Sequence, residues 1–430
     1  MRAAFYECDV TPPLGGYMPG YGKKILANDV HERLYSRAAV MEKDGESFAI
    51  VAIDTCYVPE EMHKIVTDRI YEYTKMEPER VCITSTHTHR GAPITDSPNI
   101  DCFADDAYKD VFFRLTADAV ILAYKRLEEV SVKFGVTQVE ELSFNRNFVF
   151  DDGVARTNFR RPGRVRPLGG TDPDLSVITF EKDGKPIGAI VNYACHLDCT
   201  GGVDGYSGDY ASVMEKELQK KFGNEFVSLF VPGTCGDINH IDVRRIDRDG
   251  SMPQKWHREM GRILSSAALE IMNNSAQAEG KIAVSKEILR IERRLATAED
   301  VNEKLKKILD NGDSGMRVRG LMYYATVNTL QYSDLYVQVI RIGDICIYAL
   351  PGEVYVKFGL DIKKNSPFPY NIVIENSNSY CGYIPTKEAF EPQNDIYEAT
   401  LCFHSCHIPE AGEMMVEKAL KMSEKLRKEQ

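Results

Sequence analysis

The 430-residue chain contains no apolar run that approaches the ~20 residues needed to cross a bilayer, and its first residues form no apolar core of a secretory signal. It also lacks an excess of positive charge, since 53 Lys and Arg stand against 64 Asp and Glu, a net charge of -11. That balance argues against binding to nucleic acid or to anionic membrane surfaces. These absences predict a soluble protein with no transmembrane segment and a small-molecule substrate.

The chain has no internal repeat, no low-complexity linker and no spaced cysteine framework. Its eleven cysteines are odd in number and scattered through expected strands. Such usage is typical of reduced thiols and favours a cytoplasmic location over a disulfide scaffold. Hydrophobic content of 43% and charged content of 27% are ordinary for a soluble globular protein with a sizeable core.

Apolar, β-branched runs alternate with segments of helical spacing along the chain. Strands are expected at residues 47–55, 81–86, 188–196, 226–233, 344–352 and 370–377. Helices are expected at residues 60–75, 106–129, 209–222, 253–274, 297–311 and 409–429. The pattern predicts an α/β protein, a large single catalytic domain with mixed β-sheets and flanking helices.

Histidine is scarce, with nine in the chain, yet two of them lie two residues apart directly after an expected strand. Side chains at i and i+2 of an extended segment point to the same side. Polar residues follow five of the expected strands in all: His87, His89, His196, Asp237, Glu353 and Tyr383. Because α/β proteins bind ligands at the carboxyl ends of strands, this pattern favours one site there, and imidazole, carboxylate and phenol oxygen suit zinc.

Several motifs carry a family resemblance: Thr86-His87-Thr88-His89-Arg90-Gly91-Ala92-Pro93, Asn145-Arg146, Pro351-Gly352-Glu353 and Tyr380-Cys381-Gly382-Tyr383. From about residue 5 to residue 410 the sequence resembles the catalytic domain of the neutral (non-lysosomal) ceramidases. The resemblance implies that His87, His196, Glu353 and Tyr383 bind Zn²⁺. It further implies that His89 handles a proton or supports the ligands, and that Arg146 holds the substrate carbonyl oxygen.

Two departures from the family pattern change the expected chemistry. The family carries a serine where this chain has Asn239, within Gly236-Asp237-Ile238-Asn239. An amide is no nucleophile but can donate a hydrogen bond to an oxyanion, so a zinc-bound water is the expected attacker. Family members are commonly secreted and carry a C-terminal β-sandwich. We expect residues 1–430 to form the catalytic domain alone, without that sandwich.

The expected activity is zinc-dependent hydrolysis of an amide or related acyl bond in a soluble, possibly anionic substrate. His89 or Asp237 would move the proton, and Arg146 and Asn239 would stabilise the oxyanion. Two alternatives stay open at this point. One is a metal-dependent lyase or hydrolase acting on a sugar or uronate, and the other is a non-enzymatic protein stabilised by zinc.

An arginine-dense stretch motivates the anionic substrate. Residues 146–166 hold six arginines against two acids, and glycine and proline predict a loop. Arg160 and Arg161 would grip a carboxylate or phosphate. The alternative is a solvated loop whose arginines meet acidic surface, including a subunit interface of a possible homo-oligomer.

Two smaller features carry competing interpretations. Asp54 follows the first expected strand and would either orient a ligand histidine or make strand-end hydrogen bonds. The cluster Cys402, His404, Cys406 and His407 suggests a second zinc site, but ordinary packing is the favoured interpretation.

Overall fold

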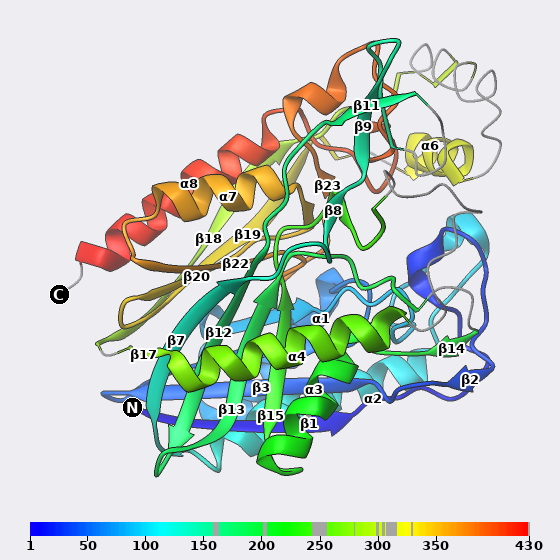
Figure 1. The fold of residues 1–430 in the computed structure, drawn as a ribbon. Coiled ribbons are helices and arrows are strands. Elements are labelled where there is room, and N and C mark those ends of the chain that lie inside the picture. Colours follow the sequence, from blue (N-terminus) through cyan, green and yellow to red (C-terminus); the bar gives the residue numbers. More distant parts are fainter. Residues whose placement is uncertain are drawn as a thin grey trace.

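The structure is a computed structural model of the chain and describes residues 1–157, 163–200, 204–242, 256–278, 280–297, 301–302, 306, 316–327 and 330–428. Three mixed sheets dominate it, each covered on its outer face by a pair of helices (Figure 1). The expected α/β class with mixed sheets and flanking helices is confirmed. Among the described residues, no helix is both long and apolar enough to span a bilayer.

The first sheet carries the strand that leads to His87. Its strands, in spatial order, are β5 (Val81–Ser85), β4 (Glu46–Ile53), β3 (Tyr35–Lys43), β1 (Arg2–Asp9) and β6 (Glu128–Glu129). Helices α1 (Glu60–Thr74) and α2 (Asp106–Tyr124) pack on its outer face. The helix expected to reach residue 129 stops at Tyr124, because the chain then enters β6 and pairs with β1.

The second sheet leads to His196. Its strands are β15 (Val227–Pro232), β13 (Lys185–Tyr193), β12 (Asp174–Lys182), β7 (Ser131–Gln138) and β17 (Ala276–Gln277). Helices α3 (Asp209–Phe222) and α4 (Trp256–Asn274) pack against each other and cover its outer face (Figure 1). The parallel pairing of β13 with β15 brings both strand ends to the same edge.

The third sheet leads to Glu353 and Tyr383. Its strands are β18 (Ile282–Glu292), β19 (Tyr332–Ile342), β20 (Ile345–Ala349) and β22 (Tyr370–Ile374). Helices α7 (Val356–Asn365) and α8 (Ala411–Lys428) lie side by side on its outer face (Figure 1). The helix expected at 297–311 lies largely outside the described residues. Helix α6 (Met316–Val327) follows that segment.

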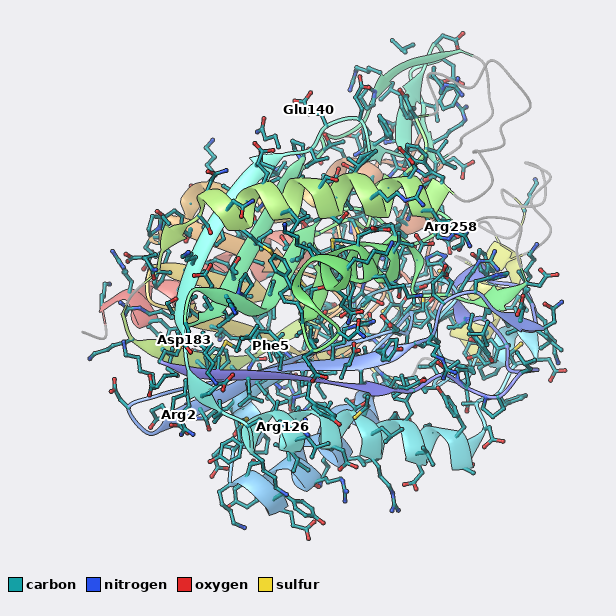
Figure 2. The ribbon with its side chains drawn as sticks, turned by 60° about the horizontal axis from the view of Figure 1, so that its bottom comes forward. Arg2, Phe5, Arg126, Glu140, Asp183 and Arg258 are labelled. Carbon is teal, nitrogen blue, oxygen red and sulfur yellow. The ribbon has the colours of Figure 1, made fainter. Side chains whose placement is uncertain are left out.

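The inner faces of the three sheets share one hydrophobic core. Strand β4 explains how: Phe48, Ile50 and Ala52 face this core, while the alternating residues face α1 and α2. Both faces are therefore buried, which is why the strand reads as a continuous apolar run. Phe5, labelled in Figure 2, packs its ring edge-on against Phe180 of the second sheet at 5.1 Å.

Short strands complete the fold: β2 (Asp29–Val30) with β14 (Gly205–Tyr206), β8 (Phe144–Asn145) with β16 (Ile238–Asn239), and β21 (Glu353–Val354) with β23 (Tyr383–Ile384). The arginine-rich stretch is not the expected loop. Its described part forms an antiparallel sheet of β10 (Ala155–Thr157), β9 (Asn147–Phe150) and β11 (Arg164–Pro167). Of the glycines that suggested a loop, Gly153 lies in the turn between β9 and β10, and Gly163 directly precedes β11, both with positive φ.

Candidate active site

Two short parallel pairings assemble the residues expected to bind metal. A bridge between Thr88 and Leu197 runs parallel, so His87 lies beside His196 with their ring centroids 4.7 Å apart. The parallel pair β21–β23 sets Glu353 directly opposite Tyr383. His87 adopts the left-handed conformation, φ 63°, which turns the chain sharply after β5. These pairings thus bring the four residues together near strand ends, as the sequence pattern predicts.

Three of the four form a tight cluster. Nε2 of His87 lies 3.3 Å and Nε2 of His196 lies 3.4 Å from the same carboxylate oxygen, Oε2 of Glu353. The three side chains are each 1% exposed. Burial works to raise the pKa of Glu353, but the two histidines hold it well below its ordinary value. Tyr380 donates its hydroxyl to Oε1 at 3.0 Å, so Oε2 faces the histidines.

These residues fit a transition metal. Nε2 of His87 and Oε2 of Glu353 are buried and make no hydrogen bond. Buried polar atoms without partners are rare and need an explanation. Nδ1 of His87 lies 2.8 Å from the Cys56 carbonyl, an arrangement that places the proton on Nδ1 and leaves Nε2 a free ligand. Two imidazoles, a carboxylate and the neighbouring Tyr383 phenol make a donor set suited to zinc.

Asp54 does not orient a ligand histidine, as one interpretation of the sequence had suggested. Its carboxylate accepts hydrogen bonds from Tyr35 N, Arg37 Nη1 and Thr86 Oγ1. It therefore ties strand ends together and anchors the residue before His87. The acceptor that orients the His87 ring is the Cys56 backbone carbonyl, and no side-chain pattern in the sequence predicts it.

Arg146 lies against this cluster and is buried. Its Nε donates to Glu398 Oε1 at 2.5 Å, its Nη2 donates to the Gly236 carbonyl at 2.7 Å, and its Nη1 lies 3.5 Å from Nε2 of His196. The guanidinium is thus fixed on two sides and directs the third nitrogen toward the cluster. Glu398, fully buried, was not singled out as a site residue from the sequence.

Asp237 and Asn239 lie behind Arg146 and do not line the cleft that contains the cluster. Asp237 accepts hydrogen bonds from Val356 N and Asn145 Nδ2, and burial raises its pKa to about 6. The side-chain oxygen of Asn239 accepts from the His240 backbone N–H at 2.6 Å. Asp237 holds the segment that presents Arg146, since its carboxylate accepts from Asn145 and its backbone carbonyl accepts from Arg146 N.

His89 has a carboxylate neighbour that the sequence analysis missed. Asp198 Oδ2 lies 3.8 Å from Nδ1 of His89, and Asp198 Oδ1 accepts a hydrogen bond from the Tyr21 hydroxyl at 2.7 Å. Gly20 packs directly on His89, since a Cβ there would lie 2.3 Å from the ring carbon Cγ. The signal in the sequence was His196-Leu197-Asp198, the same two-residue spacing as His87-Thr88-His89.

The cluster opens into a cleft of about 770 Å³, a size suited to a small-molecule substrate. Besides Tyr383, five aromatic side chains belong to its described lining: Tyr21, Tyr57, Tyr380, Tyr397 and Phe403. Its described carboxylates are Glu60, Glu61, Asp96, Asp198 and Glu353. Arg146 is the one Lys or Arg side chain of the described lining, and it is already paired with Glu398.

Arg160 and Arg161 lie outside the described residues. Of the neighbouring arginines, Arg156 pairs with Asp152 and does not line the cleft. The cysteine–histidine cluster near the C-terminus forms no candidate metal group among the residues that the structure describes. His404, one of its members, instead lines the cleft and stacks against Tyr397 at 4.9 Å.

Comparison with known proteins gives a family match and two similar folds. A family profile described as "Neutral/alkaline non-lysosomal ceramidase, N-terminal" matches residues 6–243. The structure of neutral ceramidase from Pseudomonas aeruginosa is similar with a TM-score of 0.76 and 19% sequence identity, over 99% of this chain and 74% of that chain. A ceramidase complexed with C2 gives a TM-score of 0.75 at 18% identity, over 99% and 75%. No curated protein matches the chain.

The match covers more than half of the 430 residues, and the solved structures support the same fold. The resemblance inferred from the motifs is therefore confirmed. The chain belongs to the neutral/alkaline non-lysosomal ceramidase family, whose members hydrolyse an amide bond.

Proposed function

We propose that the protein is a zinc-dependent amidohydrolase that cleaves an N-acyl substrate bound in the cleft. His87, His196, Glu353 and Tyr383 would hold the metal. The observation that carries the proposal is the pair of buried, unpartnered atoms, Nε2 of His87 and Oε2 of Glu353, that face each other at 3.3 Å. When bound, zinc supplies a Lewis acid and lowers the pKa of water toward ~7.

The surrounding side chains suit the remaining tasks of amide hydrolysis. Arg146, held by Glu398 and Gly236, directs Nη1 toward the cluster and would stabilise the negative charge that develops on the substrate carbonyl oxygen. His89 lines the same cleft and would take a proton from water and return it to the amine that leaves. Asp237 and Asn239, both outside the described lining, receive no contact with substrate in this proposal.

Asn239 stands where the family pattern has a serine, and an amide side chain cannot serve as a nucleophile. We therefore expect hydrolysis without a covalent acyl-enzyme. The experiment is a comparison of a chelator with a serine-directed phosphonate on wild-type protein that turns over a chromogenic N-acyl amide. We expect the chelator to abolish turnover, zinc to restore it, and the phosphonate to leave both activity and mass unchanged. Stoichiometric labelling by the phosphonate, or turnover that survives removal of the metal, would contradict the proposal.

The charge of the substrate needs a separate test. The described lining carries five carboxylates and one paired arginine, which favours a neutral or cationic amide over the anionic one expected from the sequence. We expect wild type to cleave neutral and cationic members of a matched N-acyl panel faster than anionic ones. We expect Arg160→Ala and Arg161→Ala to leave that order unchanged. A selective loss of kcat/KM for anionic members in these variants would instead support the anionic substrate.

Family membership and the cleft argue against the two alternatives. The family match supports hydrolysis of an amide rather than cleavage of a uronate by a lyase. The described lining also offers no unpaired Lys or Arg side chain to hold the carboxylate of a uronate. A zinc site with a purely structural role typically has four Cys or His ligands and leaves no open position for water or substrate. Here His87 and Glu353 line an open cleft of about 770 Å³. That substrates are soluble stays a prediction.

A further inference from the structure

Asp198 is the carboxylate nearest to the histidine that would move the proton. The parallel bridge between Thr88 and Leu197, with His89 N donating to the Leu197 carbonyl at 3.0 Å, sets Asp198 beside His89. Its Oδ2 lies 3.8 Å from Nδ1 of His89, which is buried and makes no hydrogen bond. The same register that places His87 beside His196 therefore places the Asp198 carboxylate beside His89.

The Asp198 side chain is held in a defined orientation. The Tyr21 hydroxyl donates to Oδ1, and the Tyr21 ring packs edge-on against His89 with centroids 5.5 Å apart. The guanidinium of Arg90 lies over the Tyr21 ring, 5.1 Å from the ring centroid. Because Gly20 fits tightly over His89, the imidazole has little freedom to turn away. Oδ2 remains as the oxygen that faces His89.

We propose that Asp198 is a positioning residue that holds the proton on Nδ1 of His89 and so presents Nε2 to the substrate. The proposal rests on the function proposed above. In the reaction, Nε2 takes a proton from the attacking water as the C–O bond forms. It then delivers that proton to the amine nitrogen as the C–N bond breaks, while the Nδ1 proton stays in place. A carboxylate partner fixes the tautomer and stabilises the imidazolium that forms between these steps.

The gap of 3.8 Å is compatible with this role, since hydrogen bonds between catalytic groups are often long in the absence of substrate. Among the described residues, the other charged or titratable groups near His89 are His87, His196, Arg90, Arg146 and Glu353. The two guanidiniums cannot accept a hydrogen bond, and the two histidines belong to the candidate metal cluster. Asp198 is thus the carboxylate through which Nδ1 of His89 can be fixed, and Glu353 is occupied by the other two histidines.

The test compares Asp198→Asn and Asp198→Ala with wild type by kcat, KM, zinc content and rescue by formate. We expect kcat to fall about 100-fold in both variants with KM and zinc content within about 2-fold of wild type. Formate should restore turnover in Asp198→Ala, where it can occupy the vacated space, and should have no effect in Asp198→Asn. Asp29→Asn, which removes an exposed carboxylate beside His31 that is not part of the described cleft lining, is the matched control.

The outcomes separate this inference from the proposed function. Wild-type kcat in Asp198→Asn, or loss of zinc from it, would overturn the positioning role even if wild type is an active zinc enzyme. A change in KM alone would assign Asp198 to substrate binding and also overturn it. By contrast, wild-type protein that is inactive on every N-acyl amide, or that ignores the chelator, would contradict the proposed function itself.

Discussion

His196→Ala is expected to lose stoichiometric zinc and to lower kcat/KM by at least about 1000-fold, because it removes one of the three clustered ligands and the Lewis acid with it. His196 is 1% exposed, and its Nε2 lies 3.4 Å from Glu353 Oε2. The measurement is metal analysis of the purified variant together with steady-state kinetics on an N-acyl amide. Thermal unfolding of the metal-free wild type separates loss of metal from loss of fold.

The control for this variant is His31→Ala, which removes a partly exposed histidine that directly follows β2 and is not part of the described cleft lining. We expect it to keep wild-type zinc and turnover. If His196→Ala retains one zinc per chain, the assignment of this histidine as a ligand is wrong. If it loses zinc but keeps turnover, the metal is structural.

Arg146→Met is the second large effect that we expect. Loss of the guanidinium should lower kcat/KM by about 100- to 1000-fold, in the range seen when an oxyanion donor is removed. It should also destabilise the protein by about 3–5 kcal/mol, because Glu398 would be left as a buried charge without its ionic partner. Thr157 Oγ1, which donates to Glu398 at 2.7 Å, cannot replace the lost charge.

A double variant separates the two consequences of losing Arg146. Arg146→Met with Glu398→Gln removes both charges of the pair, so stability should return toward wild type while kcat/KM stays low. Chemical unfolding and kinetics on the single and double variants measure both quantities. Recovery of activity in the double variant would show that Arg146 acts only by neutralising Glu398, and would remove it from the proposed oxyanion role.

The positions of the candidate ligands could be predicted from the sequence because each follows an apolar strand. Strand ends in an α/β fold gather at one edge, and the pairings of Thr88 with Leu197 and of Glu353 with Tyr383 bring the four residues together there. The sequence pattern could not predict which sheet each strand joins. Apolar alternation reports that a strand is buried, but it carries no information on which of three sheets buries it.

The residues that support the site were harder to predict, for physical reasons. The acceptor for His87 Nδ1 is the Cys56 backbone carbonyl, and any residue type supplies one. Glu398, in a short 3-10 helix (Tyr397–Ala399), and Asp198, in a loop, reach the site through segments whose position depends on long-range packing. Asp237 and Asn239 follow β15 directly, yet their side chains turn to Val356 and His240 because buried backbone N–H groups there need acceptors.

The arginine-rich stretch shows the limit of glycine and proline as loop signals. Gly153 and Gly163 have positive φ, yet the described residues around them pair as the strands β9, β10 and β11. Arg164 and Arg166 belong to β11, and Arg156 of β10 pairs with Asp152. A cluster of like charges in a sequence therefore does not by itself place those charges at the substrate.

The most direct test of the account is a crystal of the wild-type protein grown with zinc and measured on both sides of the zinc absorption edge. We predict one anomalous peak, bounded by Nε2 of His87, Nε2 of His196, Oε2 of Glu353 and the Tyr383 phenol oxygen, that vanishes below the edge. A cluster with no anomalous density in zinc-replete crystals, or a peak found only beside Cys402 and Cys406, would contradict the central claim that this cleft is a zinc-dependent active site.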